Sequence, residues 1–205
     1  MSEFTLIIGN KNYSSWSLRP WMLLRHLGLE FDEVQIALSL PDTQARIAQY
    51  SPAGRVPVLR HGELTARGWP RERAARAQAR VLSAEMHAGF QALRDQWPMN
   101  ARAVGRRTPM TAQLAADIHR IDALWSDCRQ RFGANGPWLC GEYSLADAMY
   151  APVALRFRSY GATLSAPAAS YLDTVLKDAP LQQWLADATL ESWTIGYSEV
   201  GLPGS

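Results

Sequence analysis

The sequence has only two cysteines, Cys128 and Cys140, among 205 residues, and no CxxC pair or His/Cys cluster. This scarcity excludes a disulfide framework and gives no indication of a metal site. No apolar stretch approaches the roughly 20 residues that cross a bilayer. Residues 1–6 lack the charged-then-apolar layout of a signal peptide. We therefore expect a protein of the reducing cytoplasm, with no metal and no membrane partner.

The sequence also has almost no excess of positive over negative charge, with 21 Lys and Arg against 19 Asp and Glu. The formal net charge is +2, and the arginines are scattered instead of clustered, so we expect no nucleic-acid partner. With 47% hydrophobic residues the chain can bury a core. Its length fits one large domain or two small ones. The eight tryptophans are expected mainly as core or interface anchors, and a few could line an apolar ligand pocket.

The chain divides into two halves of different character. In the first half, the pattern of apolar residues predicts the order β-α-β-α-β over residues 4–8, 18–27, 31–38, 42–49 and 56–59. This order calls for a parallel pair of strands joined by a right-handed crossover. The second predicts helices only, over residues 71–95, 111–132, 144–157, 168–176 and 181–188. The boundary falls near residues 66–70, which gives an α/β domain over residues 1–68 and an all-helical domain over residues 69–205.

Three hydroxyls, Ser14, Ser15 and Ser17, lie just ahead of the first predicted helix. A helix N-terminus favours an anion, and a hydroxyl there can donate a hydrogen bond to a thiolate. A free thiol has a pKa of about 8.5, and lowering it by about two units takes roughly 2.7 kcal/mol. One hydroxyl and a helix end can supply that much. The alternative is that these serines only cap the helix.

A second feature is the pair Val56-Pro57 at the start of a predicted strand. A cis bond here would turn the backbone of Val56 outward to pair with an extended peptide. The alternative is a trans proline on an edge strand.

Three segments together resemble the landmarks of cytosolic glutathione transferases: residues 10–21, the pair Val56-Pro57, and residues 138–147. The fold this implies is a thioredoxin-like domain followed by a helical bundle. The run Ser-Ser-Trp-Ser-Leu-Arg at residues 14–19 is similar to the serine motif of the zeta class, which includes maleylacetoacetate isomerases, although Trp16 stands where that class usually has cysteine. Residues 138–147 resemble the helix-opening box of the family, which serves folding and packing. Within them Ser144 and Asp147 have the spacing of a capping box, with Asp where Glu or Gln is usual.

The resemblance implies roles for particular residues. Ser14 would face the sulfur of glutathione, with Ser15 beside it as the second candidate. The peptide backbone of glutathione would pair with Val56 next to a cis Pro57. The glutathione-binding set would be completed by Ser17 and Arg55.

The activity implied is conjugation of the thiolate to a small electrophile, or isomerisation of a cis double bond. Glutathione would be the co-substrate, the helical half would form the electrophile pocket, and detoxification would be the setting. The protein would be a cytoplasmic homodimer. The alternative is a transferase-like binding module with little catalysis.

One stretch departs from the family pattern. After Thr65 the chain passes almost directly to Trp69-Pro70, so about 20 residues are missing: the last strand and helix of the thioredoxin-like domain and the turn that holds the γ-glutamyl carboxylate. Either the deletion is natural or engineered, or the sequence joins the two sides of a missing stretch. A real deletion would weaken glutathione binding by tenfold to more than about a hundredfold and would alter the dimer seam.

Weaker candidates remain. Tyr13 could supply a phenolic hydroxyl near the thiol, and we place it below Ser14. Residues 99–102 lie near the substrate cleft or form a solvated loop. The four histidines accompany no nucleophile motif, and Cys140 is expected to be a packed apolar residue.

Overall fold

A computed structural model describes residues 2–60 and 68–201. Its N-terminal part has the order β1 (Phe4–Ile8), α1 (Ser15–His26), β2 (Phe31–Gln35), α2 (Thr43–Ala48) and β3 (Val58–Arg60). The sheet order is β2-β1-β3, with β1 parallel to β2 and antiparallel to β3. The predicted parallel pair is therefore confirmed, and this small mixed sheet with its helices is thioredoxin-like.

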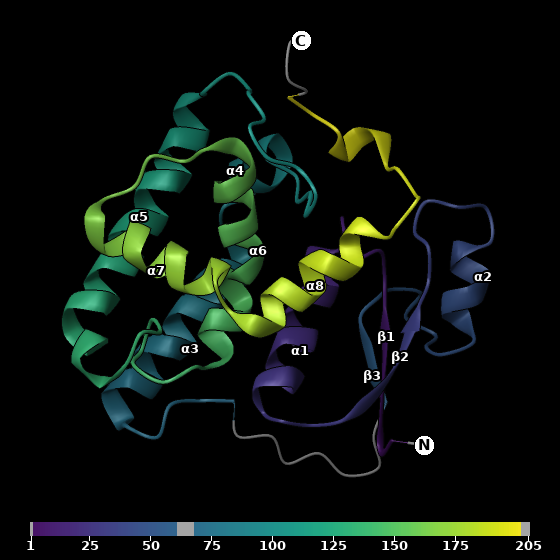
Figure 1. Ribbon diagram of the computed structural model, residues 1–205, viewed down its shortest axis with the longest axis horizontal. Helices are drawn as coiled ribbons and strands as arrows, with labels where there is room; N and C mark the ends of the chain where they lie inside the picture. Colours follow the sequence, from purple (N-terminus) through teal and green to yellow (C-terminus); the bar gives the residue numbers. More distant parts are fainter. Residues whose placement is uncertain (1, 61–67, 202–205) are drawn as a thin grey trace.

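The central strand β1 buries both of its faces because consecutive side chains alternate across a sheet. Leu6 and Ile8 join the large core that includes α1, whereas Ile7 packs with Ile36 and with Ile47 of α2. Figure 1 shows the resulting arrangement, in which α2 lies outside the sheet and α1 lies between the sheet and the other helices.

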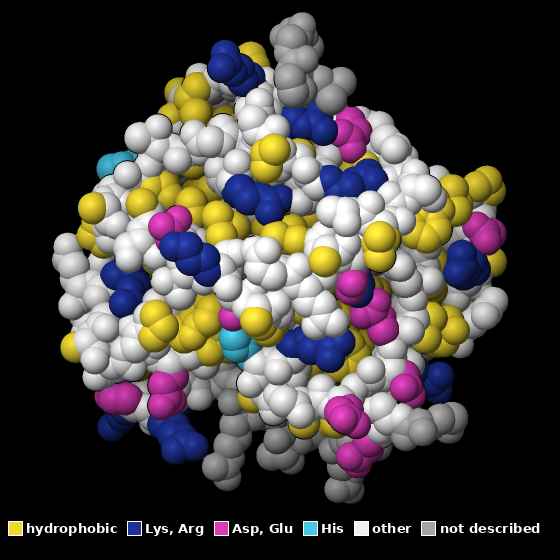
Figure 2. Space-filling model, in the orientation of Figure 1, with side chains coloured by type: hydrophobic (Ala, Val, Ile, Leu, Met, Phe, Trp, Pro, Cys, Tyr) yellow, Lys and Arg dark blue, Asp and Glu magenta, His cyan; other side chains and the backbone are white. Residues whose placement is uncertain are grey.

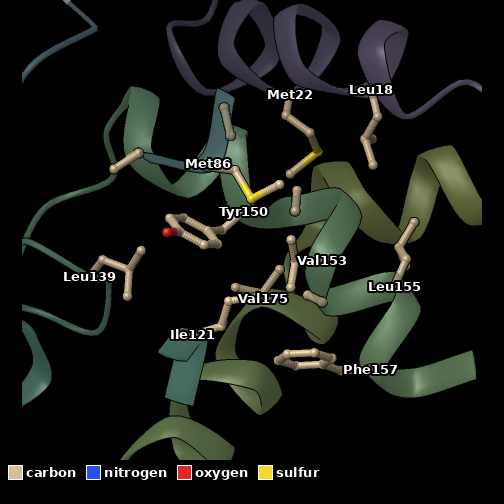
Figure 3. Close-up of a cluster of buried hydrophobic side chains, with 14 of the residues drawn as sticks. Leu18, Met22, Met86, Ile121, Leu139, Tyr150, Val153, Leu155, Phe157 and Val175 are labelled. Atoms are coloured by element: carbon tan, nitrogen blue, oxygen red, sulfur yellow. The ribbon is translucent and has the colours of Figure 1, made fainter. Parts of the chain in front are cut away.

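The remainder of the chain is helical, as expected. The helices are α3 (Arg73–Ala88), α4 (Gln91–Gln96), α5 (Ala112–Phe132), α6 (Leu145–Tyr160), α7 (Ala166–Leu176) and α8 (Ala179–Thr189), with short 3-10 turns at Gly133–Asn135 and Gly196–Ser198. Helix α6 is buried nearly all round, which marks it as the centre of the bundle. Figure 3 shows Leu18 and Met22 of α1 pointing into this core, toward Met86 and Val153.

The single long helix expected over residues 71–95 is wrong, since the chain breaks between α3 and α4. Gly89 has an extended backbone, and Phe90 is left-handed with φ 60°. That conformation is costly for a bulky residue, but it buries the Phe90 ring, which is only 6% exposed. The expected strand over residues 31–38 is also shorter and ends at Gln35.

The box at the start of α6 is a capping box, as its sequence predicts. Ser144 and Asp147 cap each other, and the Asp147 carboxylate accepts hydrogen bonds from the amides of Leu139 and Ser144 and from the Tyr171 hydroxyl. Burial raises the pKa of Asp147, and these bonds oppose the rise. The box therefore ties residues 138–147 to α6 and α7, which is a packing role.

The predicted deletion after Thr65 lies at residues 61–67, outside the described residues. Residues 68–72 form no strand or helix, so the described chain has three strands before α3 begins at Arg73. No helix among the described residues is long and apolar enough to span a bilayer. On the face shown in Figure 2, Lys and Arg side chains are interspersed with acidic and uncharged surface.

Candidate functional site

The loop between β1 and α1 carries the candidate serines. Its turn is closed by Asn10, whose carbonyl accepts hydrogen bonds from the amides of Tyr13 (3.2 Å) and Ser14 (2.8 Å). Ser14 is the N-cap of α1, and its side chain accepts a bond from the amide of Ser17. The capping interpretation of this serine is therefore correct. It uses only the acceptor side of the hydroxyl, so it leaves a donor role open.

A chain of hydrogen bonds runs from β1 to Ser14 through Ser17. The amide of Gly9 donates to Ser17 Oγ at 3.0 Å, and the Oγ atoms of Ser17 and Ser14 are 2.7 Å apart. Ser17 is fully buried, and Ser14 is 8% exposed. Ser14 is thus the outer end of a buried polar chain.

Burial decides which of the two hydroxyls donates. If Ser14 donated to Ser17, the Ser17 proton would point into the core, where it reaches no other acceptor among the described residues. An unsatisfied buried hydroxyl costs about 1–3 kcal/mol. If Ser17 donates, both of its bonds are satisfied and Ser14 accepts twice, from the Ser17 amide and hydroxyl. The Ser14 proton is then left to donate outward.

Ser15 opens α1 and is partly exposed. Its hydroxyl forms no hydrogen bond with another described residue, in contrast to that of Ser14. No acidic residue lies in the first turn of α1, so no carboxylate there opposes the field of the helix end.

The Val56-Pro57 bond is cis, as the sequence suggested. Ile7 pairs with Val58 in the antiparallel β1–β3 ladder, so residues 56–57 continue beside the end of β1, from which the serine loop leads off. The backbone of Val56 makes no hydrogen bond to another described residue. It is therefore open to an extended peptide. Arg55 beside it is exposed.

Tyr13 is not available to a thiol in this arrangement. Its hydroxyl donates to Glu199 Oε1 at 2.6 Å and accepts from Arg102 at 3.0 Å. Residues 99–102 are no solvated loop, since Asn100 is buried and donates to the same carboxylate oxygen at 2.8 Å. Burial pushes the pKa of Glu199 upward, but bonds from Tyr13 and Arg106 outweigh it and hold that pKa below its usual value.

A second carboxylate, that of Glu191, also holds the serine loop. It is 7% exposed and accepts hydrogen bonds from the consecutive amides of Lys11 and Asn12, the latter at 3.0 Å, and from the Gln35 side chain. The segment after α8 therefore holds the serine loop through two carboxylates, those of Glu191 and Glu199. Sequence reasoning missed both glutamates because nothing near residues 191 or 199 signals a contact some 180 residues away.

Among the described residues, His26, His87 and His119 form no hydrogen bond with a serine or cysteine, and His61 lies outside the described residues. His26 contacts Asp178 at 3.0 Å and stacks on Tyr143. Cys140 is buried, as expected for a packed residue. Among the described residues no group of three or more His, Cys, Asp or Glu side chains could hold a metal ion.

Comparison with known proteins bears on the fold of the chain. Residues 13–76 match the family profile of the glutathione S-transferase N-terminal domain. No curated protein matches the sequence.

Several solved structures share the fold. A glutathione transferase homolog from Burkholderia GL BGR1 with bound glutathione has a TM-score of 0.64 at 18% identity, covering 91% of this chain and 98% of its own. The Omega 3C transferase of Trametes versicolor has a TM-score of 0.65 at 14% identity, with coverages of 96% and 92%. The theta class enzyme of Xanthomonas axonopodis pv. citri, with glutathione bound, has a TM-score of 0.61 at 15% identity, with coverages of 90% and 98%. The fold is thus that of the glutathione transferases.

Proposed function

We propose that this protein is a glutathione transferase in which the Ser14 hydroxyl donates a hydrogen bond to the thiolate of glutathione. The observation that carries the proposal is the Gly9–Ser17–Ser14 chain, which fixes Ser14 at the mouth of α1 and leaves its proton without another acceptor. The match of residues 13–76 to the transferase N-terminal domain supports it.

The energetics are sufficient. A hydrogen bond to a charged group contributes about 1.5–3 kcal/mol, and the α1 N-terminus adds about 0.3–1 kcal/mol. Together they match the roughly 2.7 kcal/mol that lowers a thiol pKa by two units. The thiolate then attacks the electrophile, either to form a stable conjugate or to add and eliminate across a cis double bond.

Val56 and Arg55 would hold the peptide. The free backbone groups of Val56 pair with the cysteinyl unit of glutathione as a short added strand. Arg55, exposed beside it, would meet a carboxylate of the tripeptide. The helical part supplies the electrophile pocket. We further propose a cytoplasmic homodimer, and isomerisation as a second activity on the strength of the zeta-like residues 14–19.

One observation favours a binding module instead. The described residues contain neither the fourth strand nor the carboxylate-holding turn of the family pattern, and α3 begins at Arg73, soon after β3 ends at Arg60. A site without that turn would bind glutathione more weakly, and the fold would then serve recognition only.

Thermal melts with and without millimolar glutathione, combined with a chromogenic conjugation assay, test the proposal. We expect a glutathione-dependent rise in melting temperature and turnover that falls at least tenfold in Ser14→Ala but less than threefold in Ser15→Ala. A melting shift without turnover would establish the binding module. No shift at all would show that the site is lost. The mass of the intact protein reports whether the deletion after Thr65 is real.

A further inference from the structure

Arg19, on the second turn of α1, has a buried guanidinium that forms no ion pair or hydrogen bond within the described part of the chain. The residue is 4% exposed, and its Nε and Nη1 atoms are buried with no hydrogen bond to any described residue. No described carboxylate forms an ion pair with it. Buried charges in proteins are normally paired, so this one indicates a counter-ion that is not part of the described chain.

Two further arginines concentrate positive charge at the same place. Burial, together with the weaker repulsion from Arg156 and Arg94, lowers the pKa of Arg19 to about 9. Within the described part of the chain, Arg156 donates only to the neutral carbonyls of Trp97 and Pro152. Arg94 also donates to carbonyls, its Nε is buried and unpaired, and Asp117 and Asp95 partly offset its charge. The cluster therefore retains excess positive charge at Arg19.

Trp16 covers this cluster. Its ring lies 4.0 Å from the Arg19 guanidinium and 5.9 Å from that of Arg94, and its edge meets His87 at 5.3 Å. Trp16 is nevertheless 41% exposed, an unusual state for an indole. A rotation of this one side chain would open Arg19 to solvent.

The cluster adjoins the proposed thiol site. Arg19 follows the N-cap Ser14, the proposed thiolate donor, by five residues, about 7.5 Å along the axis of α1, and it shares a helix face with Ser15 beside Ser14. Helical side chains also lean toward the N-terminus, which brings the guanidinium closer to the first turn. An anion at Arg19 is therefore within the length of a small molecule that reacts at the sulfur.

We propose that Arg19, with Arg94 and Arg156 behind it, binds a carboxylate next to the thiol site, under the cover of Trp16. A flat monoanion suits a planar guanidinium, and it could reach Arg19 once the Trp16 ring turns aside. The role of this site in catalysis rests on the proposed function. The bound carboxylate then belongs to the electrophile or to the glycyl end of glutathione. The site would then select acidic electrophiles or orient the tripeptide.

Sodium acetate tests the site without glutathione. Against sodium chloride at equal ionic strength, saturating acetate should raise the melting temperature of the wild type by about 3 °C. Arg19→Gln should remove the shift, and Arg25→Gln, which changes an exposed arginine on the same helix, should retain it. Arg19→Met should melt higher than the wild type without acetate, because an unpaired buried charge is gone. An equal acetate shift in Arg19→Gln and the wild type would overturn the proposal.

Kinetics identify the source of the carboxylate. If it belongs to the electrophile, Arg19→Gln should lower kcat/KM about 10- to 100-fold for an acidic electrophile and less than twofold for its methyl ester. If the carboxylate belongs to glutathione, the same variant should weaken the binding of glutathione but not the binding of its glycyl ethyl ester. Equal losses for all four compounds would contradict the site. Failure of turnover in the wild type would count against the proposed function. The acetate melts would still test whether the arginine cluster binds a carboxylate.

Discussion

Ser17→Ala is the most informative single change, because Ser17 links β1 to the proposed catalytic hydroxyl. The substitution removes the bond to Ser14 and leaves the Gly9 amide unpaired in the core. Losing the first costs about 1 kcal/mol and leaving the second unsatisfied costs about 1–3 kcal/mol. We expect the free energy of unfolding to fall by about 2–4 kcal/mol, measured by urea denaturation at pH 7.

A matched control is available in α3. Ser83 is also a buried helical serine, but it only donates to the carbonyl of Ala79 at 2.8 Å, so Ser83→Ala leaves no buried amide unpaired and should cost about 1 kcal/mol. If Ser17→Ala is no more destabilising than this control, the Gly9–Ser17–Ser14 chain does not hold the loop and the reasoning is refuted.

Three other changes follow from the loop contacts. Tyr13→Phe should lower stability by about 1–2 kcal/mol in urea melts but change kcat less than threefold, since the phenol is engaged by Glu199; a larger loss of kcat would assign Tyr13 a catalytic role. Glu191→Ala should cost about 2–4 kcal/mol and Glu191→Gln less, because two loop amides lose a buried acceptor; equal urea midpoints in both variants and the wild type would contradict this. The pKa of Glu199 is lowered in the fold, so the ionised Glu199 side chain stabilises the protein above its unfolded pKa near 4.3. This stabilisation is lost as the pH falls below that value. Glu199→Gln should therefore lose less stability than the wild type between pH 6 and pH 3.5.

Local sequence patterns predicted the elements well where burial and periodicity agree. The strand at residues 4–8 is apolar and β-rich, and its bounds are those of β1. The capping box at Ser144 was readable because its partner Asp147 is three residues away. The break at Gly89-Phe90 was not readable, because the backbone at Phe90 is set by the pocket that receives its ring.

The candidate site shows the same difference between local sequence patterns, which could be read, and contacts between distant residues, which could not. The serine run and Val56-Pro57 were found because each is a local pattern at a helix or strand start. Their support was not found, since it comes from Glu191 and Glu199 beyond α8. Likewise, Arg19 looks like an ordinary helical arginine in the sequence, and only the fold shows that it is buried near Arg94 and Arg156 with no counter-ion among the described residues.

The thiol pKa of bound glutathione tests the central claim most directly. It can be followed by the ultraviolet absorbance of the thiolate as the pH is raised, in the wild type and in Ser14→Ala. We predict a bound pKa about two units below the free value of about 8.5 in the wild type, and a rise of about one to two units in the variant. The same bound pKa in both proteins would show that the Ser14 hydroxyl does not stabilise the thiolate.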